Sequence, residues 1–109
     1  MNTTTEITFP RANWIDYEMG RVLIEHDDSL DSGVVFHIFW GEHSSTFIMF
    51  LEQDALGDDF FVVLTTDERQ EVCRGCQYGE RYIFRRFDCE RESYVSPFIA
   101  AAQVIYNVM

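Results

Sequence analysis

Short apolar runs separated by turn residues dominate the middle of the chain. Three of these runs are rich in β-branched and aromatic residues, which favours strands over helices. Glycine and aspartate, which supply the backbone freedom of tight turns, lie between the runs. The runs are Val34–Trp40, Thr46–Leu51 and Phe60–Leu64. We therefore predict three consecutive strands at the centre of one sheet.

Two further segments extend this pattern. Arg21–His26 predicts a strand before the central three. Arg81–Asp88 alternates imperfectly and carries arginine on both sides, which is typical of an edge strand. Because the connections are short, we expect an antiparallel meander of about five strands.

The segment Phe98–Tyr106 predicts the main helix. Ser96 is a strong N-cap residue, and Pro97 suits the first helical position. An apolar stripe for packing on the sheet follows at helical spacing, formed by Phe98, Ala101, Ala102 and Ile105.

Two shorter segments predict additional helices. The first is Thr65–Arg74, where Thr65 and Glu68 form a capping box and Gly75 suits the stop. The second is Pro10–Met19, although the alternation of its apolar residues also fits a strand. The predicted fold is a single α+β domain over residues 1–109. It is an antiparallel β-meander of about five strands, with a C-terminal helix packed on one face and one or two short additional helices.

The central strands are apolar on both faces, which predicts that both faces are covered. The C-terminal helix covers one face. We expect the N-terminal segment, a short helix or a second protein chain to cover the other, which leaves a homodimer open.

The start of the chain has no basic residue followed by a long apolar run, so no signal peptide is predicted. The longest unbroken apolar runs are five residues, far below the roughly 20 needed to span a bilayer. Three cysteines fit a reducing compartment. We therefore expect a cytoplasmic protein with no membrane association.

Acidic residues outnumber basic ones, and they are unevenly placed. The 109 residues hold 19 acids, eight arginines and no lysine, for a formal charge of −11. Residues 1–68 hold fourteen acids and two arginines, a balance of −12, and residues 69–109 hold five acids and six arginines, a balance of +1. A molecule with this field repels phosphate, which argues against direct binding of nucleic acid.

Two acidic clusters fall in predicted turns, one before Val34 and one before Phe60. Alternate turns of a meander emerge at the same end of the sheet, so we expect the clusters to share one rim. Such a rim fits a surface that meets a basic partner, and solubility is the simpler alternative. The predicted partner-binding residues are Asp27, Asp28, Asp31, Asp54, Asp58 and Asp59.

Cys73-Arg74-Gly75-Cys76 is the only motif with chemical content. It is compatible with a redox dithiol or half of a zinc site. In the predicted helix, however, Cys73 would lie in the last turn, where the dipole disfavours a thiolate. An extended strand would also separate Cys89 from the pair. We therefore predict structural thiols and no cofactor, with a thiol or zinc protein using Cys73 and Cys76 as an alternative.

The three histidines lie near acids or serines, so a hydrolytic triad can be imagined. No Gly-x-Ser-x-Gly turn presents a nucleophile, and His37 on a buried strand fits a hydrogen-bonded core residue. We predict no catalytic residue. A small enzyme with an aromatic pocket around His37 remains a second alternative.

Size and charge together predict a non-enzymatic inhibitor that neutralises a basic, nucleic-acid-handling protein. Small acidic proteins of this kind include immunity proteins of nuclease toxins, antitoxins, and phage anti-restriction or anti-CRISPR proteins that mimic nucleic acid. This is an analogy at the level of the class, and no motif here identifies a family.

Overall fold

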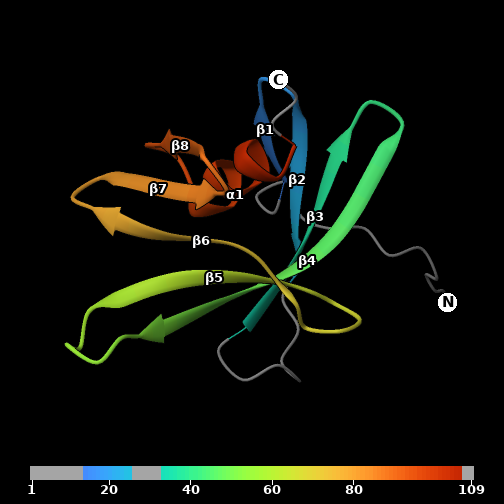
Figure 1. The fold of residues 1–109 in the computed structure, drawn as a ribbon. Coiled ribbons are helices and arrows are strands. Elements are labelled where there is room, and N and C mark those ends of the chain that lie inside the picture. The colour runs from blue at the N-terminus through green and yellow to red at the C-terminus, as the bar shows by residue number, and fades with distance from the viewer. Residues whose placement is uncertain (1–13, 26–32, 107–109) are drawn as a thin grey trace, which may run out of the picture.

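The structure is a computed structural model that describes residues 14–25 and 33–106. These residues form eight strands and one helix, α1, and every strand pairs antiparallel with its neighbours in chain order (Figure 1). The strands are β1 (Trp14–Tyr17), β2 (Gly20–Glu25), β3 (Gly33–Trp40), β4 (His43–Gln53), β5 (Asp59–Thr65), β6 (Glu71–Tyr78), β7 (Arg81–Arg86) and β8 (Cys89–Ser93). The helix α1 covers Pro97–Ile105.

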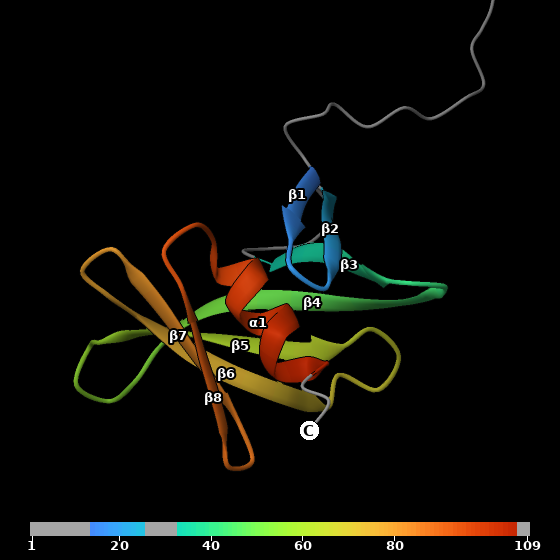
Figure 2. The same ribbon diagram turned by 90° about the horizontal axis from the view of Figure 1, so that it is seen from above.

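The sheet curls around α1, which lies in its hollow (Figures 1 and 2). The helix packs on β6, β7 and β8 and also contacts β2 near the other end of the strand order. We call the side of the sheet that faces α1 the inner face. Its fully buried side chains include Val22, Phe36, Ile38, Val63 and Phe84. Alanines on α1 are also fully buried, so the helix backbone approaches the sheet closely.

The opposite side, which we call the outer face, is also rich in apolar side chains. Guanidinium groups lie over three of its aromatic rings, 5.2–5.9 Å from the ring centroid: Arg21 over Trp14, Arg69 over Phe50 and Arg74 over Phe60. Arginine can cover an apolar surface with its stem and ring-facing guanidinium while its charge stays in water. Arginine side chains thus cover part of the face for which an N-terminal segment, a short helix or a second chain was expected.

Six of the predicted elements are present. The three central strands, the strand before them, the strand predicted over Arg81–Asp88 and the C-terminal helix all form, with ends no more than three residues from the predicted ones. The hydroxyl of Ser96 accepts a hydrogen bond from the amide of Phe98 at 3.0 Å, and Pro97 is the first helical residue. The buried stripe is wider than predicted and runs through Ile99, Ala100, Ala101, Ala102 and Val104.

The predicted fold class is nevertheless wrong. The described residues form a curled sheet of eight strands with α1 as their only helix, so the fold is mostly β and not α+β. Neither short additional helix forms in this part of the chain, and three strands were missed.

The segment Thr65–Arg74 was predicted as a helix and instead turns the chain from β5 into β6. The hydroxyl of Thr65 accepts from the amide of Gln70 at 3.0 Å, and their backbones bond at 2.9 Å. The same side-chain acceptor that caps a helix can close a turn. Gly75 lies in β6 rather than at a helix end. The absence of a side chain there makes room for Phe84, because a Cβ would stand 2.4 Å from the Phe84 ring.

The segment Pro10–Met19 is also not the predicted helix. Residues 10–13 lie outside the described part of the chain, and the remainder forms β1 and the turn into β2. Ile15 pairs with Val22 and Tyr17 with Gly20, so alternation was the correct reading of this pattern.

The strand β8 was missed, and its neighbour β7 was wrongly predicted to be an edge strand. β8 has the sequence CERES, without an apolar alternation. It is held to β7 partly by ion pairs of Arg81 with Glu92 and of Arg85 with Glu90. Two of the three arginines of β7 therefore pair with the next strand, and Arg86 donates to the carbonyl of Val72 on β6, so none of them blocks an edge.

Candidate functional site

The β4–β5 turn carries three of the predicted partner-binding residues. One carboxylate oxygen of Asp54 accepts from the amides of Leu56 at 2.9 Å and Asp58 at 3.0 Å. Two backbone bonds within the turn, of 2.9 and 3.0 Å, close it further. Asp54 thus organises the turn, while the exposed Asp58 and Asp59 are available to a partner.

A cleft of about 650 Å³ separates this turn from the β6–β7 turn. The register of β5 with β6 is paired only as far as Phe61 with Gly75, and beyond it the two hairpins diverge (Figure 1). Asp54, Asp58 and Asp59 line the cleft together with Phe60, Tyr78 and several neighbours. The negative charge of a Cys76 thiolate is the largest cause that raises the pKa of the neighbouring Tyr78 hydroxyl. The cleft therefore combines carboxylates with aromatic rings.

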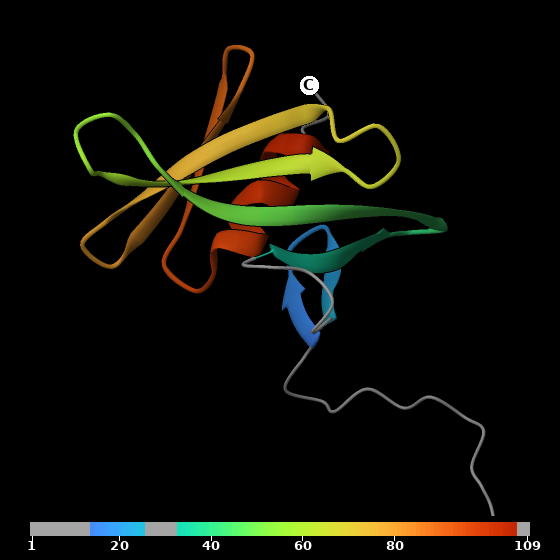
Figure 3. The same ribbon diagram turned by 90° about the horizontal axis from the view of Figure 1, so that it is seen from below.

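Exposed apolar side chains gather at the same end of the sheet. Leu56 is 86% exposed at the tip of the acidic turn, and Tyr78 is 57% exposed on the other side of the cleft. Tyr94 and Val95, in the connection from β8 to α1, are also exposed. Figures 2 and 3 both show this connection and the two turns on one side of the molecule. Large exposed apolar side chains that cluster in this way mark interaction surfaces.

We call this region the acidic end. It comprises Asp54, Asp58 and Asp59 with Leu51, Leu56, Tyr78, Tyr94 and Val95. The other predicted rim residues, Asp27, Asp28 and Asp31, lie outside the described residues. The antiparallel order does place the end of β2 and the start of β3 at this same end of the sheet. The partner-binding prediction remains a prediction for both clusters.

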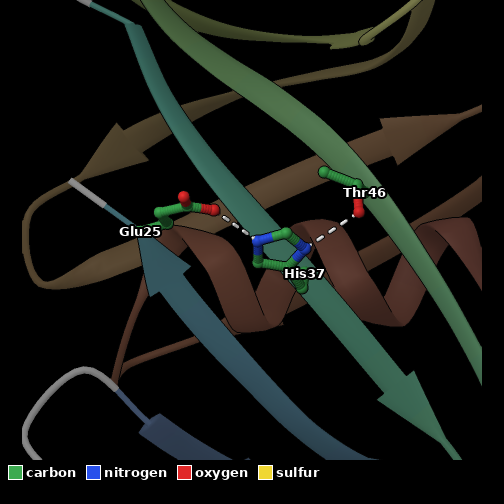
Figure 4. Close-up of polar contacts among 3 residues, drawn as sticks. All are labelled: Glu25, His37 and Thr46. Carbon is green, nitrogen blue, oxygen red and sulfur yellow. Dashed lines mark hydrogen bonds and ion pairs between the residues drawn. The ribbon is translucent and has the colours of Figure 1, made fainter. Parts of the chain in front are cut away.

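His37 on the outer face lies at the centre of a chain of hydrogen bonds across three strands (Figure 4). Its Nε2 is 2.6 Å from Oε2 of Glu25 on β2, and its Nδ1 is 2.8 Å from Oγ1 of Thr46 on β4. With a neutral ring, Thr46 donates to Nδ1 and the Nε2–H group donates to Glu25. Both ring nitrogens are therefore satisfied, as expected for a structural histidine.

The order hydroxyl, imidazole, carboxylate is also that of a catalytic triad, so its chemistry needs a separate test. His37 and Thr46 occupy paired positions on β3 and β4, which both lie inside the sheet. Amides of interior strands bond to neighbouring strands, which leaves few donors for an oxyanion. The arrangement favours a structural role over acyl transfer.

The partners of His37 were not found from the sequence. Glu25 and Thr46 stand 12 and 9 residues away, and only the strand register brings them to it. Of the other histidines, His26 lies outside the described residues. The ring of His43 contacts the ring of Trp40 in a tilted arrangement, with 5.9 Å between the ring centroids, which gives His43 a packing role in the β3–β4 hairpin.

The two cysteines of the Cys-x-x-Cys motif point to opposite faces of the sheet, because they stand three residues apart on the strand β6. Cys73 is buried on the inner face, and burial raises the pKa of its thiol to about 12. Cys76 lines the cleft, and all three thiols are free. In residues 14–25 and 33–106, no group of three His, Cys, Asp or Glu side chains is placed to hold a metal ion.

No family model, curated protein or solved structure matches this chain. The function therefore has to be argued from the residues of the site. Nor does the part of the chain described here contain a helix long and apolar enough to cross a membrane.

Proposed function

We propose that this protein is a non-enzymatic binding protein whose acidic end engages a basic protein surface in the cytoplasm. The cleft carries this proposal, because it brings three carboxylates and three exposed or half-exposed aromatic rings together between two hairpins. Carboxylates attract arginine and lysine side chains, and aromatic rings bind the same cations through their faces.

Two kinds of contact at the acidic end affect different steps of binding. The carboxylates, within a molecule of charge −11, raise the rate of encounter with a basic surface. The apolar side chains supply contact area that excludes water and lowers the dissociation rate. A surface with both is better suited to a protein partner than one with charge alone.

We further propose that the partner handles nucleic acid, as nucleases and related effectors do. Their phosphate-binding surfaces are concentrations of arginine and lysine, and a row of carboxylates presents the same sign of charge as the phosphates they bind. Occupying such a surface would inhibit the partner without chemistry.

The test is capture of the partner from the native host, followed by association kinetics at two salt concentrations. The double variant Asp58→Asn, Asp59→Asn should associate several-fold more slowly and with a flatter salt dependence, since charge steers association and salt screens it. The control Glu42→Gln, Glu68→Gln removes the same charge at the opposite end of the sheet, where both side chains are exposed. Equal effects of the two double variants would show that the acidity serves solubility only.

A further inference from the structure

A second cavity adjoins the acidic cleft on the outer face. It has a volume of about 560 Å³ and shares four wall residues with the cleft, which are Asp54, Phe60, Cys76 and Tyr78. Ile83 on β7 completes its apolar wall, and Arg74, Arg85 and Glu90 stand at its rim. Because the two cavities share a wall, they form neighbouring subsites of one groove.

We propose that this groove binds an extended segment of the partner that carries a basic side chain and, two residues away, an apolar side chain. The inference rests on the proposed function and specifies the two side chains of the partner that the acidic end recognises. In an extended segment, residues i and i+2 point to the same side, about 7 Å apart, so they enter neighbouring subsites.

The first subsite selects a basic side chain. Asp54, Asp58 and Asp59 supply negative charge on one wall, and the ring of Tyr78 supplies a face for a guanidinium or ammonium group. A carboxylate of the partner would meet three like charges there.

The second subsite selects an apolar side chain, because the charges on its rim already neutralise one another. Two hydrogen bonds of 2.9 and 2.6 Å join Arg74 to Glu71, and an ion pair joins Arg85 to Glu90. What remains toward the groove is Phe60, Ile83, the ring of Tyr78 and the thiol of Cys76, with Asp54 on the wall shared with the first subsite.

The wall between the subsites is held in place before any partner arrives. The Arg74 guanidinium lies over the ring of Phe60 at 5.2 Å while Glu71 fixes its position. Tyr78 and Cys76 stand two residues apart on β6, so the strand holds both on the same face of the sheet. Groups held in position in this way lose little conformational entropy on binding.

The experiment is a titration of the isotope-labelled full chain with four blocked pentapeptides, followed by amide chemical shifts. The sequences are Ser-Arg-Ser-Leu-Ser, Ser-Arg-Ser-Ser-Ser, Ser-Ser-Ser-Leu-Ser and Ser-Glu-Ser-Leu-Ser. We expect shifts at Phe60, Cys76 and Tyr78, and affinity about tenfold higher for the Arg-Ser-Leu peptide than for either single-residue peptide. Equal affinity for all four, preference for the glutamate peptide, or shifts confined to other regions would overturn the proposal.

Two variants separate the subsites, and spectra of the free variants confirm that they fold. Asp58→Asn with Asp59→Asn should remove the preference for arginine and keep that for leucine. Ile83→Thr, which keeps a β-branched residue in β7, should do the reverse. The control Glu42→Gln, Glu68→Gln should bind as the unchanged protein does. Loss of both preferences in each variant would contradict two subsites.

Two further outcomes distinguish this inference from the proposed function. If the peptides fail to bind while association with the captured partner still depends on Asp58 and Asp59, the inference is wrong and the proposed function stands. If the association rate with the captured partner is unchanged when Asp58 and Asp59 are replaced, the proposed function is wrong. Concentration-dependent shifts at the groove without peptide would assign it to a second copy of this chain, which would also overturn the inference.

Discussion

The inner and outer faces of the sheet both carry apolar side chains, and these are covered in different ways on the two faces. The inner face packs on α1, and Phe36 and Phe84 are fully buried there. On the outer face, arginines lie over half-exposed rings such as Phe50 and Phe60. A packed helix fixes its face permanently, whereas side-chain cover leaves cavities between the rings. The helix closes the inner face, and the cavity that we propose as a binding subsite lies on the outer face.

The largest expected difference is between two phenylalanines on adjacent hairpins. Phe84→Ala should lower the free energy of unfolding by about 4 kcal/mol, because it leaves a cavity under α1 and beside Gly75. Phe60→Ala on the outer face should lower it by about 1 kcal/mol, since its ring is partly exposed and the site is open to water. Urea unfolding of both variants measures the contrast, and similar losses would show that the outer face is also core.

A second difference concerns the thiols. Burial raises the pKa of the Cys73 thiol from 9.0 to about 12. As the pH rises from 9 towards 12, the unfolded chain releases this proton and the folded protein keeps it, so stability falls by about 1.4 kcal/mol per pH unit. We expect a loss of about 2 kcal/mol between pH 9 and 10.5 from this group. Cys73→Ala should lose correspondingly less over that range, and equal slopes for the two proteins would refute the assignment.

Elements whose evidence is local could be predicted from the sequence. Val34–Trp40 and its two successors are strands because branched and aromatic residues suit a pleated sheet on either face. The helix α1 begins at Pro97, after the N-cap Ser96, and this cap involves only neighbouring residues. The acidic turn was also placed correctly between β4 and β5.

Elements that depend on pairing could not be predicted. The hydroxyl of Thr65 can cap a helix or close a turn. It closes a turn here because the residues that follow pair with β7 as the strand β6, where Gly75 lies opposite Phe84. β8 has no apolar pattern and is recognisable only beside the arginines of β7. The cleft depends on two hairpins diverging, and the His37 chain depends on the register of three strands. The spacing of residues along the chain predicts neither the diverging hairpins nor the hydrogen bonds of His37.

A smaller effect on stability is expected at the His37 chain. Thr46→Val keeps the shape of the side chain and removes its hydrogen bond to Nδ1, which should lower the free energy of unfolding by about 1 kcal/mol. If the chain is structural, any slow hydrolysis of p-nitrophenyl acetate by the protein should be the same before and after the change. A loss of hydrolysis in Thr46→Val, with the fold intact, would instead favour the enzyme alternative.

The smallest effect on stability should accompany a large effect on binding, at the tip of the acidic turn. Leu56 is 86% exposed, so Leu56→Ser should change the free energy of unfolding by no more than about 0.5 kcal/mol. Its side chain contributes only when a partner covers it. If Leu56 is an anchor of that contact, its loss should raise the dissociation rate about thirtyfold, as expected for about 2 kcal/mol of binding energy.

The variant to compare with Leu56→Ser is Asp58→Asn with Asp59→Asn, which should act mainly on the association rate. Asp54 is unsuitable for this purpose, because its carboxylate also holds the amides of Leu56 and Asp58. Kinetics of the captured partner on both variants decide between the roles. If Leu56→Ser slows association and leaves dissociation unchanged, the tip does not make the apolar contact, and the anchor must lie elsewhere at the acidic end, on Tyr78, Tyr94 or Val95.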